Sequence, residues 1–151
     1  MITDWEPLYE NLPDEEKDKI AILRVMECTN GIIQHAYRDG DKWALPVDET
    51  RKAMKFSMGC IKRMQIPLKE ETITFAPETQ ELMRSARQLY IDGVKKGDDG
   101  AFAEFMAISA ITARVVGKER IERARDILAE QVDQIPSDTL QWGVDYLMQF
   151  F

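Results

Sequence analysis

Hydrophobic residues recur every three or four positions along most of this chain, a spacing that predicts amphipathic α-helices. Residues 101–116 differ, because their apolar side chains point in nearly every helical direction and only Glu104 and Arg114 are charged. A helix that is apolar almost all round must be covered almost all round. It is also shorter than the ~20 residues of a membrane span. We therefore expect residues 101–116 to form the buried central helix of a bundle, or a helix buried between subunits.

Capping and turn residues divide the remaining pattern into helices with short connections. Pro77 and Gly97 have the positions expected of a helix start and a helix end. Asp98 or Asp99 can cap the next helix, which Gly117 ends. Such a series predicts an all-α fold, an irregular bundle of about six helices. The helices are expected over residues 11–38, 48–65, 77–97, 98–117, 118–134 and 139–151.

Evidence for β-structure is slight. Residues 72–75 alternate like a short strand and are expected to pair with residues 43–45. A lone pair of strands is marginally stable, so this is at most a minor two-stranded element. At 151 residues, of which 44% are hydrophobic and 31% charged, the chain has the size and composition of one globular domain, residues 1–151.

Several signals for targeting are missing from the sequence. The first residues lack the basic and apolar regions of a signal peptide, and no run of 18 apolar residues occurs. Cys28 and Cys60 are far apart and have no metal-type spacing. We therefore expect a cytoplasmic protein with reduced thiols and no membrane attachment.

Charge is unevenly distributed along the chain. The net charge of −7 disfavours general affinity for nucleic acid. Residues 51–96 nevertheless hold 10 basic and 5 acidic side chains, between flanks with 12 acidic and 5 basic and with 10 acidic and 5 basic side chains. Two interpretations are open: the basic middle pairs with the chain's own acidic flanks, or it forms a binding surface.

The predicted helix over residues 48–65 has one purely basic face. At about 100° per residue its cations fill one contiguous polar arc, and apolar side chains rich in methionine fill the rest. Such a helix can bind a partner's acidic groove, a nucleic-acid backbone or an anionic membrane, or it can simply be solvated. The candidate partner-binding residues are Arg51, Lys52, Lys55, Met58, Lys62 and Arg63.

Signals for catalysis are weak. His35 is the only histidine, so histidine-based zinc sites are not expected. On one helix, Cys28 and His35 would lie two turns apart, ~10 Å along the axis, which is too far for a dyad. We interpret both cysteines as small core residues and His35 as a residue at the edge of the core. Glycine-rich phosphate loops and nucleophile elbows are missing, so neither a cofactor nor a metal is predicted.

Pairs of acids at i, i+3 offer one enzymatic alternative, because oxygen ligands on neighbouring helices can hold Mg²⁺. In a chain with 27 acids such pairs arise easily. We interpret them as solvated faces with ion pairs inside the helix, for example Glu119 with Arg123. The pairs are Glu78 with Glu81, Glu119 with Glu122, and Glu130 with Asp133.

Glu104 and the aromatic residues each allow two interpretations. If buried, Glu104 would need a partner outside its helix; otherwise it lies in the first helical turn and reaches water. Aromatic residues gather near both ends of the chain, where they either close the bundle against each other or form a dimer seam. The candidate seam is Trp142, Tyr146 and Phe150, with Trp5 and Tyr9 preceding the first helix.

Taken together, these patterns favour a protein–protein interaction protein without catalysis of its own: a small acidic adaptor, inhibitor or assembly factor. Its partner is expected to be another protein, and a homo-oligomer is possible. The first alternative is a nucleic-acid-associated regulator that uses the basic face of residues 48–65. The second is a metal-dependent hydrolase that uses the glutamate pairs.

Overall fold

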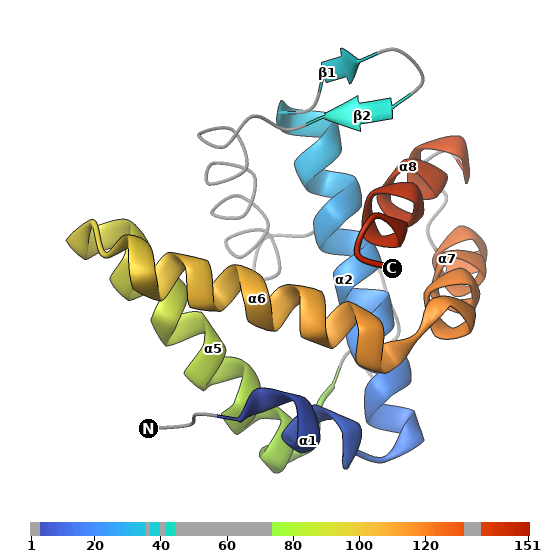
Figure 1. Ribbon diagram of the computed structural model, residues 1–151. Helices are drawn as coiled ribbons and strands as arrows, with labels where there is room; N and C mark the ends of the chain where they lie inside the picture. The colour runs from blue at the N-terminus through green and yellow to red at the C-terminus, as the bar shows by residue number, and fades with distance from the viewer. Residues whose placement is uncertain (1–3, 36, 40–41, 45–73, 132–136) are drawn as a thin grey trace.

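The computed structural model describes residues 4–35, 37–39, 42–44, 74–131 and 137–151 (Figure 1). These residues form a helical bundle with one small β-hairpin, which confirms the predicted all-α class. The elements are α1 (Trp5–Glu10), α2 (Asp14–His35), β1 (Tyr37–Asp39), β2 (Lys42–Ala44), α5 (Pro77–Lys96), α6 (Asp99–Val116), α7 (Lys118–Gln131) and α8 (Ser137–Met148).

Helix α2 runs through the middle of the bundle, with α7 and α8 along one side and α6 crossing it (Figure 1). Seven consecutive residues, from Ile20 to Met26, are buried. Seven consecutive positions face every direction around a helix, so this part of α2 is covered all round. The sequence predicted that residues 101–116 would be buried on nearly all sides. In the structure, the helix that is buried on all sides is α2.

Helix α6 begins and ends where its capping residues predict, but its burial is one-sided. The side chain of Asp98 accepts a hydrogen bond from the Ala101 amide at 3.1 Å, and Gly117 follows the last residue. Ala103, Ala107 and Arg114 are exposed. The buried positions are Ala101, Phe102, Phe105, Ile108, Ser109, Thr112, Ala113 and Val116.

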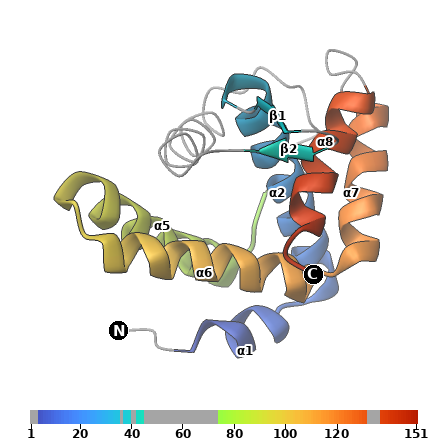
Figure 2. The same ribbon diagram turned by 45° about the horizontal axis from the view of Figure 1, so that its top comes forward.

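Helices α5 and α6 form an antiparallel hairpin that extends away from α2, α7 and α8 (Figure 2). Gly97 joins them in the left-handed conformation, φ 64°, which glycine adopts without steric cost. The two helices approach closely at Gly93, where an added Cβ would lie 2.7 Å from the Cβ of Phe102. The Tyr90 ring packs against Phe105, with the ring centroids 5.2 Å apart.

Both ends of the chain pack into the fold, at different places. Trp5 and Tyr9 are buried in α1, a helix that the sequence analysis did not predict, and α1 packs against α6. Helix α8 packs against α2 and α7 instead. The two aromatic ends thus cover different helices.

Two predicted boundaries near residue 38 need correction. The first long helix begins at Asp14 as expected but ends at His35, and Tyr37–Asp39 is a strand. Strand β2 includes Trp43 as expected, yet its antiparallel partner is β1, with Arg38 opposite Trp43. A tight local hairpin closes a far shorter loop than pairing with residues 72–75 would, and its entropic cost is lower. Residues 74 and 75 are not in a strand.

Other predicted segments lie outside the described residues. These are the helix over residues 48–65, residues 72–73 and the end of the helix expected over residues 118–134. In the described ranges, no single helix is both long and apolar enough to cross a membrane. Helices α6 and α7 reach that length and composition only as a pair, with an 88° bend between them.

Candidate interaction surface

One side of α6 points away from the core and is partly exposed, and most of its residues are apolar. At about 100° per residue, six positions fill a contiguous arc opposite the buried side of the helix. Four of the six are apolar, and one acid and one base lie among them. We call this surface the outer face of α6; it consists of Ala103, Glu104, Ala107, Ala110, Ile111 and Arg114.

The opposite side of α6 is fixed within the core. Phe102 and Phe105 pack against Tyr90 of α5, at ring-centroid distances of 6.4 and 5.2 Å. The buried hydroxyl of Thr112 donates to the Ile108 carbonyl at 2.7 Å, which satisfies it within its own helix. The packing of its buried side therefore fixes the position of α6, and with it the position of the outer face.

Glu104 lies at the edge of the outer face and is half-buried. It is the sixth residue of α6, so it stands beyond the first turn in which one interpretation placed it. The indole Nε1 of Trp5 donates to its Oε1 at 3.4 Å, which links α1 to α6. A buried Glu104 was expected to need a partner outside α6. Trp5 is such a partner, although Glu104 is only half-buried. Arg114 is exposed.

A buried ion pair lies on α2, where the sequence analysis identified no functional residue. Nη1 of Arg24 is 2.9 Å from Oε2 of Glu27, and both side chains are 11% exposed. Burial disfavours the charge of Arg24, but Glu27, with smaller contributions from Tyr9 and Cys28, more than offsets this and raises the pKa of Arg24. The i, i+3 spacing of these residues was a visible signal, but such spacing does not distinguish a buried pair from a solvated one.

Cys28 follows this pair and is partly buried against the core, as the interpretation of a small core residue expects. Burial, with a smaller contribution from Glu27, raises the pKa of its thiol to about 12. The thiol is therefore protonated at neutral pH and a poor nucleophile. The side chain of His35 and the whole of Cys60 lie outside the described residues.

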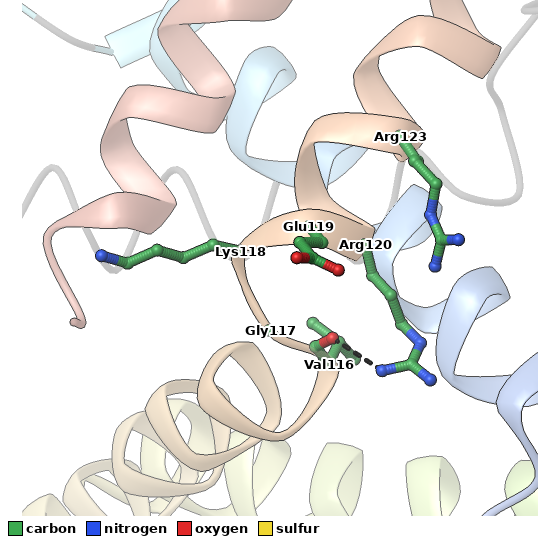
Figure 3. Close-up of a pocket in the computed structure, with 6 residues that line it drawn as sticks. All are labelled: Val116, Gly117, Lys118, Glu119, Arg120 and Arg123. Carbon is green, nitrogen blue, oxygen red and sulfur yellow. Dashed lines mark hydrogen bonds between the residues drawn. The ribbon is translucent and has the colours of Figure 1, made fainter.

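The start of α7 forms a pocket of about 330 Å³ with three cationic side chains (Figure 3). Lys118 extends to the side opposite Arg120 and Arg123, so the three charges do not converge on one point. Arg120 donates to the Val116 carbonyl at 3.2 Å. Its Nη2 and Nε lie 2.6 and 3.0 Å from the carboxylates of Asp14 and Asp18. This arginine joins α7 to the first turns of α2 and is engaged in that contact.

The glutamate pairs do not assemble into one site in the described part of the chain. Glu78, Glu81, Glu119, Glu122 and Glu130 are exposed, and Asp133 lies outside the described residues. Glu81 pairs with Arg84 within α5. Arg123, expected to pair with Glu119, lies 3.3 Å from Asp18 of α2. Within these ranges no group of three or more potential metal ligands comes together.

Of the two surfaces predicted from sequence, one can be located. The basic residues 51–63 lie outside the described residues. Trp142 and Tyr146 lie on α8, which ends at Met148 rather than at residue 151, and Phe150 lies in the turn that follows. All three are half-buried, and the rings of Tyr146 and Phe150 meet edge to face at 6.1 Å. Burial raises the pKa of Tyr146 to about 12. The predicted seam is therefore partly used in the packing of a single chain.

Comparisons of the chain with protein-family models, with curated proteins and with solved structures found no match. The described residues define a helical bundle in which one face of α6 is partly exposed. The apolar character of residues 101–116 was predictable from the sequence, but the side of the helix that faces outward was not predicted. The available signal for an outward side was a stripe of small and charged residues along the helix: Ala103, Ala107, Ala110 and Arg114.

Proposed function

We propose that this protein works by binding another protein chain, as an adaptor, inhibitor or assembly factor, without catalysing a reaction itself. The observation that carries this proposal is the outer face of α6. Scattered exposed apolar residues are ordinary, but a contiguous apolar stretch on one rigid helix is typical of an interaction site. Ala103 and Ala107 are exposed in this stretch, and Ala110 and Ile111 are half-buried.

The support behind the face favours the same function. A surface that is already ordered loses little conformational freedom when a partner binds, so more of the contact energy contributes to affinity. Trp5 and Tyr9 hold α1 against one side of α6, and α5 packs along another. The outer face needs no rearrangement before it can be covered.

The titratable groups of the described residues also favour binding over catalysis. Cys28, the nucleophile that sequence analysis considered, has a thiol pKa raised to about 12 by burial. The exposed acids of α5 and α7 lie on solvated faces, where Glu81 pairs with Arg84 in its own helix. These observations therefore favour a binding protein over a metal-dependent hydrolase.

A nucleic-acid-associated role is the second candidate, and the sequence supplies the observation that favours it. Arg51, Lys52, Lys55, Lys62 and Arg63 follow one another without an intervening acid. Binding through such a face would neutralise phosphates and release counterions, so its affinity would fall steeply with salt. Binding through the apolar face of α6 would depend on salt much less.

One affinity purification tests both candidates. The tagged protein is isolated from its native host with and without nuclease, beside an Ala107→Glu variant and an Ala129→Glu control. Ala107 and Ala129 are both exposed helical alanines, on α6 and α7 respectively. We expect a nuclease-resistant protein partner that Ala107→Glu loses and Ala129→Glu keeps, with the interaction reproduced by the purified partner.

Three results would contradict the proposal. Recovery of nucleic acid, with partners lost after nuclease treatment, would favour the basic face instead. A partner that both variants keep would exclude the outer face of α6 as the contact surface. The absence of any partner, a second copy of the chain included, would turn attention to metal and ligand screens by thermal shift.

A further inference from the structure

We propose that the outer face of α6 binds a second copy of this chain, with the two α6 helices packed antiparallel. This inference rests on the proposed function, and it names the partner. Three features of α6 support it: the order of its charges, the residues between those charges, and the surroundings of the charges in a single copy.

The charges of the outer face are self-complementary in one direction only. Glu104 and Arg114 are ten residues apart, which is about 15 Å along a helix. If a two-fold axis passes at the level of Ser109, midway between them, each Glu104 lies opposite the partner's Arg114. Two equivalent ion pairs then form, as an isologous interface requires. A parallel arrangement would place like charges together and is disfavoured.

The residues between the two charges suit close packing of helices. Ala107 and Ile111 are equidistant from the level of Ser109, so each Ala107 faces the partner's Ile111 across the axis. Ala110 lies near the axis itself. Because the distance between packed helices depends on the side chains at the contact, alanines allow a close approach. Covering Ile111 and both alanines would remove the apolar centre of the outer face from water.

In a single copy, the two charges retain capacity for a partner. Trp5 donates to one oxygen of Glu104 at 3.4 Å, and a carboxylate can accept further hydrogen bonds. This contact also holds Glu104 at the edge of the outer face. Arg114 is exposed in the last turn of α6, and within the described ranges it forms no ion pair. An acid and a base that do not pair with each other in one copy can therefore pair between two.

Sedimentation velocity over a range of protein concentrations tests this arrangement. We expect a concentration-dependent dimer for the wild-type chain. Arg114→Glu and Glu104→Arg each replace two attractive contacts with repulsive ones, so each variant should dimerise on the order of tenfold more weakly or worse. The double variant Glu104→Arg/Arg114→Glu should recover dimerisation, because both pairs re-form with their signs exchanged.

Additional variants separate loss of the dimer from loss of the fold. Glu104→Arg removes the contact with Trp5, whereas Arg114→Glu alters an exposed side chain and is the cleaner single change. Ala107→Glu brings two like charges close to the axis and should give a monomer with an unchanged circular dichroism spectrum. Ala129→Glu on α7 should dimerise like the wild type.

These experiments test the identity of the partner separately from the proposed function. A wild-type chain that stays monomeric, together with a different protein that Ala107→Glu fails to capture, would overturn this inference and leave the proposed function intact. A dimer that survives all the α6 variants would also overturn the inference and favour the stripe of Trp142, Tyr146 and Phe150. A monomer that captures no protein through α6 would overturn both.

Discussion

Gly143 of α8 lies directly against Thr29 of α2. A Cβ placed on Gly143 would be 2.2 Å from the Thr29 hydroxyl oxygen and 3.1 Å from the Val25 carbonyl oxygen. The Thr29 hydroxyl is buried and donates to that carbonyl at 2.7 Å, so it cannot move away without losing its hydrogen bond. The contact between α2 and α8 therefore depends on a residue without a side chain.

Gly143→Ala should destabilise the protein by about 2 kcal/mol or more, despite the better helix propensity of alanine. The added methyl group has to displace the backbone of α2 as well as the Thr29 side chain. Urea denaturation measures the change in the free energy of unfolding. Gly97→Ala is the comparison, because Gly97 has a positive φ and no atom within 4 Å of an added Cβ. That variant should lose about 1 kcal/mol, and equal losses would contradict the packing explanation.

Glu16 joins the first turns of α2 and α5. Its Oε1 accepts hydrogen bonds from the Ala76 amide and, at 2.9 Å, from the Thr79 hydroxyl; Lys19 lies 3.1 Å from Oε2. Burial would raise the pKa of Glu16, but these hydrogen bonds and the Lys19 charge more than offset it and hold the pKa below its ordinary value. The carboxylate thus caps a helix that begins 61 residues later in the chain, at Pro77.

Glu16→Gln should cost about 2 kcal/mol near neutral pH, because hydrogen bonds to a charged acceptor are replaced by weaker ones. The lowered pKa means that the ionised carboxylate stabilises the fold above the ordinary glutamate pKa of about 4.3. This contribution disappears as the pH falls through the folded-state pKa. Wild type and variant should therefore converge in stability in acid. Glu15→Gln, at an exposed neighbouring acid, should follow the wild type; a gap independent of pH would contradict the assignment.

The effects of removing Arg24 and Glu27 on stability should be coupled. Arg24→Met leaves the largely buried Glu27 carboxylate without the cation 2.9 Å away, at an expected cost of about 3 kcal/mol. The double variant Arg24→Met/Glu27→Gln should cost less than the sum of the single changes. A double-mutant cycle in thermal or chemical unfolding measures this coupling. Additive costs would show that the two residues act independently.

The thiol of Cys28 should react slowly with alkylating reagents. With its pKa raised to about 12, the thiolate fraction near pH 8 is roughly a thousandfold below that of an ordinary cysteine of pKa ~8.5. Iodoacetamide labelling of a Cys60→Ala variant, followed by mass spectrometry, measures the rate. Unfolding in urea should restore ordinary reactivity, and fast labelling of the folded chain would contradict the assignment.

Local signals predicted the ends of several helices correctly. Pro77, Gly97, Asp98 and Gly117 satisfy or interrupt backbone hydrogen bonds within a few residues, so their effect does not depend on the rest of the fold. The helix from Trp5 to Glu10 also had a local signal in the spacing of Trp5, Tyr9 and Leu12. Its six residues are too few for stability in isolation, so its formation depends on the burial of Trp5 and Tyr9.

The contacts between elements could not be predicted in the same way. Residues 101–116 are more apolar than α2, yet α2 is the helix with complete cover. Hydrophobicity indicates how much surface a helix can bury, but the choice of neighbours decides which helix is surrounded. The same limit applies to the outer face of α6 and to Arg24, because sequence spacing alone does not reveal which side of a helix meets the core.

The distance in sequence between α2 and its partners has a consequence for synthesis on the ribosome. Residues 14–35 emerge early, but Thr79 has to be made before Glu16 has its partner, and Gly143 before Thr29 is covered. The last of these contacts requires residue 143, which is made 114 residues after Thr29. Until then the side of α2 that faces α8 is open to solvent and to other nascent chains, so this bundle can finish folding only after α8 has been made.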